Sequence, residues 1–195
     1  MSKGDETRAA ILDEAIDIAS TKGFAGLTIG MLAEATDMSK SGLFAHFKSK
    51  EELQLQTLER ARERFVDVVV RPSLSAPRGE KRVRGLLENW LRWADDALSG
   101  GCLFIGAATE LDDQPGALRD LLVRNEQDWL DVIANVAATA VAEGDFAADT
   151  DVEQFAYDVH GVTLAYHHHS RLMRDPRAVE RTESAFESLL ESARA

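Results

Sequence analysis

The chain has few of the residues that mark secreted, membrane-spanning or β-rich proteins. Cys102 is its single cysteine, so no intrachain disulfide can form, and we expect a reducing, cytoplasmic setting. Its apolar runs are short and broken by charges, and the opening MSKGDETRAA lacks the apolar stretch of a secretion signal, so we expect no membrane association. There are only four prolines, and β-branched runs are rare. Because Ala, Leu, Glu, Arg and Asp dominate instead, the composition predicts an all-α fold.

The net charge of −12 is unevenly distributed along the chain. Residues 1–50 carry six lysines and arginines against seven acids, whereas the rest of the chain carries 16 against 27. Three of the six early bases are Lys40, Lys48 and Lys50. An acidic protein repels nucleic acid except where a basic cluster faces it. The overall charge therefore does not exclude a DNA-binding function.

Apolar periodicity, capping residues and helix breakers predict about nine helices, of which the first three are short. Thr28 and Ser39 are good N-cap residues, and the turn 36–38 separates the helices that they open. Residues 49–52 and 150–153 have the pattern of capping boxes, and Pro72 is expected to close the fourth helix near Val70. The other helices are expected over about 6–21, 80–98, 102–111, 115–143, 151–173 and from 176 onward.

The segment from Thr28 to Leu53 has the pattern of a helix-turn-helix. Its second helix opens on small and basic residues, while Leu43 and Phe47, four positions apart, share an apolar face. A short helix with this division suits the major groove of DNA, because the N-terminal turn of a recognition helix reaches the base edges.

The polar residues of this segment divide into base readers and phosphate anchors. Lys40 is suited to donate to guanine, Ser41 can bond either kind of base, and Gly42 permits close backbone approach. For Phe44, contact with a thymine methyl group and packing in the core are both open. In isolation, the opening of this helix would be read as a solvated turn with a capping serine. The predicted DNA-binding residues are Thr28, Ser39, Lys40, Ser41, Gly42, Phe44, His46, Lys48 and Lys50.

Several motifs follow one another in a fixed order: Gly23-Phe24, Leu27-Thr28, Ala33-Glu34-Ala35, Met38 to Phe44, and His46 to Leu53. In this order they resemble the DNA-binding region of TetR/AcrR-family transcriptional repressors. The resemblance implies a helix-turn-helix domain over residues 1–50 and a helical ligand-binding and dimerisation domain over residues 51–195. Ala45 departs from the pattern, because many members carry a phosphate-binding tyrosine at this place.

The resemblance also carries functional implications. It implies a homodimer that pairs through the last two helices and binds double-stranded DNA at an inverted-repeat operator. A small-molecule effector would bind in the C-terminal domain and release the DNA. The family resemblance implies no catalytic activity, no cofactor and no metal, and we find no nucleophile elbow, phosphate loop or paired-carboxylate motif in the sequence.

Aromatic residues at helical spacing in the C-terminal half predict either a core or the wall of a pocket. A pocket for an apolar or amphipathic ligand is built from the same residue types with a few polar groups added. The predicted pocket residues are Trp90, Trp93, Cys102, Phe104, Trp129, Tyr157 and His160.

A histidine run supports an alternative hypothesis, a helical metal- or ligand-binding protein centred on His160, His167 and His168. Adjacent residues of a helix point about 100° apart, so neighbouring histidines cannot converge on one ion. No Cys, Asp or Glu lies at the offset that would complete a ligand set. We therefore predict no metal site and favour packing in an interface as the role of this run.

Overall fold

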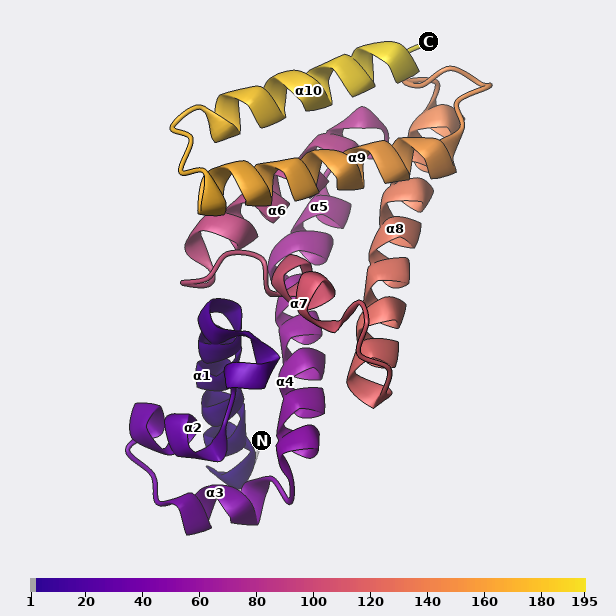
Figure 1. Ribbon diagram of the computed structural model, residues 1–195. Coiled ribbons are helices and arrows are strands. Elements are labelled where there is room, and N and C mark those ends of the chain that lie inside the picture. The colour runs from indigo at the N-terminus through magenta and orange to yellow at the C-terminus, as the bar shows by residue number, and fades with distance from the viewer. Residues whose placement is uncertain (1–2) are drawn as a thin grey trace. The chain divides into compact units, whose positions relative to one another are not determined.

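The computed structural model describes residues 3–195, and these residues form nine continuous helical stretches (Figure 1). The all-α prediction is confirmed. None of the helices in this described part is both long and apolar enough to cross a membrane. The elements are α1 (Lys3–Gly26), α2 (Ile29–Thr36), α3 (Lys40–His46), α4 (Lys50–Phe65), the π-helical turn η1 (Val66–Val70), α5 (Arg71–Ser75), α6 (Glu80–Asp96), α7 (Leu103–Leu111), α8 (Ala117–Glu143), α9 (Val152–His167), the π-helical turn η2 (His168–Leu172) and α10 (Ala178–Ala193).

The chain packs as two compact units, which we call the first and the second unit. The first unit is residues 3–65 together with Asp95–Asn125, and the second is Val66–Ala94 together with Glu126–Ala195. The N-terminal helices therefore pack with a later segment that contains α7. The functional boundary that we predicted after residue 50 stays a prediction.

The fourth helix does not end at Val70, and the prediction that Pro72 closes it is wrong. The helix continues through η1 into α5 and ends at Ser75. Proline has no N–H to donate, and its ring pushes against the carbonyl group four residues earlier. A π-helical turn widens the helix locally at such places, and η1 contains Val68, the residue four positions before Pro72. The helix therefore accommodates the proline and continues beyond it.

The cap of α9 differs by one residue from the predicted capping box. The carboxylate of Asp151 accepts hydrogen bonds from the backbone N–H groups of Glu153 and Gln154, at 3.2 and 3.0 Å. Thr150, the expected cap, instead donates through Oγ1 to the carbonyl oxygen of Ala193 at 3.4 Å. The carboxylate prevails because a charged acceptor is favoured at the positive end of the helix dipole.

Apolar side chains of the short N-terminal helices meet those of α1 and α4 to form the core of the first unit. α1 packs along α4, and α2 contacts both α1 and α3. Burying one such side chain stabilises the fold by about 1.5–3 kcal/mol. The fully buried side chains here include Ile16, Phe24, Leu27, Leu32, Leu43, Phe47, Leu53 and Leu58.

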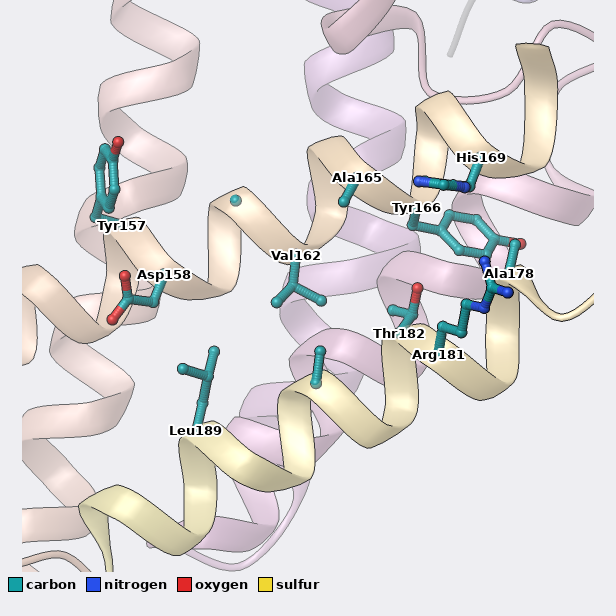
Figure 2. A pocket seen from close by; sticks show the side chains of 12 residues that line it. Tyr157, Asp158, Val162, Ala165, Tyr166, His169, Ala178, Arg181, Thr182 and Leu189 are labelled. Atoms are coloured by element: carbon teal, nitrogen blue, oxygen red, sulfur yellow. The ribbon is translucent and has the colours of Figure 1, made fainter. Parts of the chain in front are cut away.

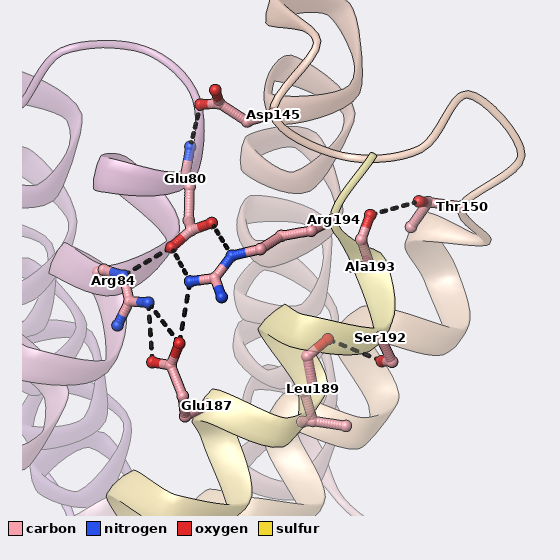
Figure 3. Close-up of polar contacts among 9 residues, drawn as sticks. All are labelled: Glu80, Arg84, Asp145, Thr150, Glu187, Leu189, Ser192, Ala193 and Arg194. Carbon is pink, nitrogen blue, oxygen red and sulfur yellow. Dashed lines mark hydrogen bonds and ion pairs between the residues drawn. The ribbon is translucent and has the colours of Figure 1, made fainter.

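A network of charged side chains joins α6 to α10 within the second unit (Figure 3). Arg194 donates through Nε and Nη2 to the two carboxylate oxygens of Glu80, both at 2.8 Å, and through Nη2 to Glu187 at 2.9 Å. Arg84 completes the network with bonds to Glu80 at 2.7 Å and to Glu187 at 2.9 Å. The two arginines thus share the two carboxylates.

Acid should weaken this network through Glu80. The hydrogen bond from Arg194 is the main reason why the pKa of Glu80 lies at about 2 instead of its ordinary 4.5. A depressed folded-state pKa adds stability that is present above 4.5 and is lost as the pH falls toward 2. We expect Glu80→Gln to lower the free energy of unfolding by about 1 kcal/mol at neutral pH, a modest value because the network is partly solvated.

Urea unfolding at neutral pH and at several acidic pH values measures this effect. The difference between the native protein and Glu80→Gln should vanish as the pH approaches 2. Glu191→Gln is the matched control, because Glu191 is an exposed carboxylate of α10 outside the network drawn in Figure 3. A difference that stays constant with pH would contradict the expectation.

Candidate nucleic-acid interface

α2 begins and ends where the sequence predicts. The hydroxyl of Thr28 caps its N-terminus by accepting a hydrogen bond from the N–H of Met31 at 3.2 Å. At its C-terminus, Asp37 takes the left-handed conformation (φ 53°, ψ 34°). A left-handed residue at this position turns the chain away from the helix axis. The turn of the helix-turn-helix is therefore built around Asp37.

The N-terminal turn of α3 is organised by Ser39. Its hydroxyl accepts a hydrogen bond from the N–H of Gly42 at 3.1 Å and lies 3.1 Å from the hydroxyl of Ser41. A Cβ atom at Gly42 would lie 3.2 Å from the Ser39 hydroxyl, a tight approach. Ser39 is thus engaged as a cap, as predicted, and glycine at position 42 leaves that cap room. Lys40 and Ser41 are exposed at the same turn.

Two buried side chains hold α3 in the first unit. Leu43 and Phe47 are fully buried, as their spacing predicts. The guanidinium group of Arg8, on α1, lies over the ring of Phe47 at 5.4 Å from its centroid, and it also donates to the side chain of Gln56. The contact of Arg8 could not be predicted from the sequence, because it depends on how α1 packs and leaves no local pattern.

Phe44 is the exposed aromatic residue of α3. Its side chain is 54% exposed, which decides between the two alternatives left open for it. It does not belong to the core. An exposed phenyl ring next to the predicted base readers is available for an apolar contact.

Thr28 and Lys40 come together at the first turn of α2. A Cβ atom built at Gly30 would lie 3.7 Å from Oγ1 of Thr28 and 3.8 Å from Cε of Lys40. The amino group of Lys40 therefore extends over the start of α2, where Thr28 is the cap. The helix-turn-helix thus presents a predicted phosphate anchor and a predicted base reader side by side.

The other predicted anchors are held in different ways. Lys48 and Lys50 are exposed, whereas His46 is half-buried, with its ring 6.2 Å from that of Phe47. The ammonium group of Lys50 donates to the backbone carbonyl of Ala25 at 2.8 Å. Lys50 therefore already makes a structural hydrogen bond. A bound phosphate would share the N–H donors of its ammonium group with the carbonyl oxygen of Ala25.

The exposure of Phe44 leads to a prediction about thymine recognition. Phe44→Ala should change the free energy of unfolding by no more than about 0.5 kcal/mol, as is usual for exposed positions. If the ring contacts a thymine methyl group, losing that group costs about 0.8 kcal/mol, roughly fourfold in affinity. Binding to operator DNA with uracil in place of single thymines measures this.

The native protein should lose affinity at one or more of these uracil substitutions, and Phe44→Ala should be insensitive to the same substitutions. Equal sensitivity of the two proteins at every thymine would show that Phe44 does not read a methyl group.

Five of the seven predicted pocket residues are buried: Trp90, Trp93, Cys102, Phe104 and Trp129. Cys102 and Phe104 pack in the first unit and the other predicted residues belong to the second, so neither unit alone assembles all seven. Tyr157 is 70% exposed and is one of the residues that line the groove between α9 and α10 (Figure 2).

His160 pairs with a carboxylate that the sequence analysis did not name. Its Nε2 lies 3.4 Å from a carboxylate oxygen of Glu126, on α8, and both side chains are mostly buried. Burial lowers the pKa of His160 and raises the pKa of Glu126, so both shifts favour the uncharged forms. The pair is a polar spot among the helices of the second unit.

His167, His168 and His169 do not form a metal-binding group with His160. The rings of His168 and His169 contact each other at 5.7 Å, and burial lowers the pKa of His167. Within residues 3–195, no three His, Cys, Asp or Glu side chains are grouped so that they could hold a metal ion. The structure therefore does not favour the metal-binding alternative.

Comparison with known families matches two segments of the chain. Residues 11–57 match the bacterial regulatory proteins of the tetR family, and residues 79–186 match the tetracyclin repressor-like C-terminal domain. The chain belongs to the TetR family. The resemblance seen in the N-terminal motifs is thereby confirmed, and it extends to the C-terminal part, where the sequence analysis found only a helical layout in common.

Relatives of this TetR-family protein include characterised regulators. The HTH-type transcriptional regulator TcmR of Streptomyces glaucescens is 30% identical over 125 residues, which are 62% of this chain and 54% of TcmR. The match thus spans about half the length of that relative.

Solved structures of the family share the fold over nearly the whole chain. The TetR-family regulator of Cytophaga hutchinsonii has a TM-score of 0.86 at 20% identity and covers 100% of this chain and 98% of its own. The regulator CifR was solved as a cysteine mutant with 26-bp operator DNA. It has a TM-score of 0.77 at 27% identity, and the match covers 95% of this chain and 96% of the CifR chain.

Proposed function

We propose that this protein is a sequence-specific DNA-binding transcriptional regulator, a repressor that a small molecule releases from its operator. The observation that carries the proposal is the division of α3. Leu43 and Phe47 fix one side of the helix in the core, while the capped N-terminal turn leaves Lys40 and Ser41 exposed. The relative CifR, which shares this fold, was solved with operator DNA.

In this proposal, some exposed residues of the helix-turn-helix contact base edges and others contact phosphates. Lys40 and Ser41 read base edges, with Phe44 available for a thymine methyl group. Phosphates are held by basic side chains and by the hydroxyl and N–H groups at the start of α2. Ala45 offers no hydroxyl, so Lys48 and the cap at Thr28 carry more of the phosphate binding.

We propose that two copies pair through α9 and α10. The groove between these helices has a volume of about 540 Å³ and is lined mainly by small and apolar residues such as Gly161, Ala165 and Leu189 (Figure 2). Further apolar side chains of α9 and η2, among them Leu164 and Leu172, are exposed. A four-helix bundle across a two-fold axis would cover this surface. The operator would then be an inverted repeat with half-sites about 34 Å apart or a small multiple of this.

We propose that the effector binds among the helices of the second unit. The Glu126–His160 pair offers a donor and an acceptor, and the buried Trp129 lies one turn along α8 from Glu126, which suits an amphipathic molecule. Release of DNA requires only that the effector binds the released state better, with a coupling of typically ~1–3 kcal/mol. The proposed function involves no catalysis and no cofactor, and as a DNA-binding regulator the protein would act in the cytoplasm.

A mobility-shift titration with the DNA upstream of the protein's own gene tests this function. We expect a discrete complex that survives an excess of unrelated competitor DNA and weakens steeply with salt. Binding with equal affinity to the upstream and unrelated fragments, at low and moderate salt, would refute the proposal.

A further inference from the structure

The carboxylate of Glu110, near the end of α7, binds the backbone where α1 ends. Its Oε2 accepts a hydrogen bond from the N–H of Phe24 at 2.7 Å, and its Oε1 accepts one from the N–H of Ala25 at 2.5 Å. Glycine at position 23 makes room for it, because a Cβ atom there would lie 2.6 Å from Oε2. Gly23 also has φ 71° and ψ 170°, a conformation that breaks the helix and suits glycine.

The carbonyl groups of the same two residues are held from α4. The side-chain amide of Gln54 donates to the carbonyl oxygen of Phe24 at 2.6 Å, and Lys50 donates to that of Ala25 at 2.8 Å. We call residues 23–27 the α1–α2 corner. α7 thus supplies the acceptors for this corner and α4 the donors, so the direction in which the chain leaves α1 is defined from both sides.

α7 is fastened to α1 at its other end too. Just before α7 begins, the N–H of Ser99 donates to the carboxylate of Asp17 at 2.8 Å, and the N–H of Gly100 donates to the hydroxyl of Ser20 at 3.0 Å. A Cβ atom at Gly100 would lie 1.8 Å from the carbonyl oxygen of Ser20, so this approach requires glycine. α7 is therefore attached at both ends along the last turns of α1.

The α1–α2 corner leads directly into the helix-turn-helix. Leu27 is fully buried, and its N–H bonds to the carbonyl oxygens of Gly23 and Phe24, both at 3.2 Å. The next residue is Thr28, which caps α2 and is a predicted phosphate anchor. A shift of the corner therefore moves the cap of α2, and with it the helices that would lie on DNA.

We infer that Glu110 is a positioning residue for DNA recognition. From α7, outside the segment that contains the predicted DNA contacts, its carboxylate fixes the α1–α2 corner and so sets the placement of α2 and α3. This inference rests on the proposed DNA-binding function.

Glu110→Gln tests the inference, because the side chain keeps its size but turns one acceptor into an amide donor that faces an N–H group. Charge-assisted hydrogen bonds are strong enough that losing one costs roughly tenfold in an equilibrium constant, so we expect about tenfold weaker operator binding. Binding to unrelated DNA should stay unchanged or tighten, because the variant has lost a negative charge.

Asp113→Asn is the matched control, since it removes the same charge from an exposed residue just beyond α7. If Glu110 acted through its charge alone, both variants would bind the operator at least as tightly as the native protein does. That result would overturn the inference. A general loss of folding would lower operator and unrelated binding together and lower the urea midpoint. The inference instead predicts a lower ratio of operator to unrelated binding at a temperature where both variants are fully folded.

Hydrogen exchange of the free proteins tests the hydrogen bonds between Glu110 and the α1–α2 corner without DNA. The amides of Phe24 and Ala25 should exchange faster in Glu110→Gln than in the native protein and in Asp113→Asn. Unchanged exchange at these two amides would overturn the inference even if DNA binding fell. If the native protein itself showed no operator preference, the proposed function would fail before any variant is compared, while the exchange result would still report on the hydrogen bonds between Glu110 and the α1–α2 corner.

Discussion

Gly161→Arg should convert the protein to a monomer that no longer shifts its operator. Gly161 lies on α9 and lines the groove between α9 and α10, and a Cβ atom there meets nothing within 4 Å in its own protomer. We therefore expect the substitution to leave the fold of each protomer intact. In a dimer paired through these helices, however, it buries two unpaired charges at the interface.

The expected loss is large because buried, uncompensated charges are costly. Leaving a charge buried without a partner costs about 3–5 kcal/mol, which raises the dissociation constant of the dimer by a factor of roughly 10²–10⁴. A monomer holds a single half-site and loses most of the affinity for the inverted repeat. Sedimentation velocity and mobility shifts at matched concentrations measure the two effects.

Gly106→Arg is the control for this substitution. Gly106 is an exposed glycine within α7 whose Cβ position is equally open, and it lies outside the groove. The native protein and Gly106→Arg should sediment with twice the chain mass of 21.4 kDa, and Gly161→Arg with that mass alone. A dimeric Gly161→Arg with native operator affinity would place the interface elsewhere.

Lys40→Ala and Lys48→Ala should weaken operator binding in two distinguishable ways. Lys40 lies at the N-terminal turn of α3, so its loss should cost about 1–3 kcal/mol and relax the preference at one position of each half-site. Lys48 follows α3 and is predicted to hold phosphate. Its loss should weaken all sequences alike and reduce the slope of log K against log salt by about 1 for each half-site.

Binding of both variants to the operator and to a set of single-base variants, at several salt concentrations, separates these effects. Lys22→Ala is the control, because it removes the same charge from an exposed position of α1 outside the predicted contacts. Identical profiles for Lys40→Ala and Lys48→Ala would contradict the division into readers and anchors.

Features that depend on neighbouring residues could be predicted from the sequence. The caps Thr28 and Ser39 and the turn at Asp37 follow from hydrogen bonds within three or four residues. The buried face of Leu43 and Phe47 follows from helical spacing. For these features the local pattern and the tertiary structure agree.

Features that depend on contacts between distant segments could not be predicted, because such contacts leave no local pattern in the sequence. Glu110 binds a corner 86 and 85 residues away along the chain, and the ring under Arg8 belongs to another helix. Glu126 meets His160 from a different helix as well. The extension of the fourth helix through Pro72 depends on a π-helical turn, for which the sequence has no simple signal.

Selection of binding sites from a pool of random duplexes shows whether α3 of each protomer in a dimer reads one half of an inverted repeat. We expect an enriched inverted repeat with half-site centres about 10 base pairs apart or a small multiple of this, and Lys40→Ala should lose the preference at one position of both halves. Absence of any enriched sequence, or enrichment of a single asymmetric site that Lys40→Ala selects equally well, would contradict this expectation.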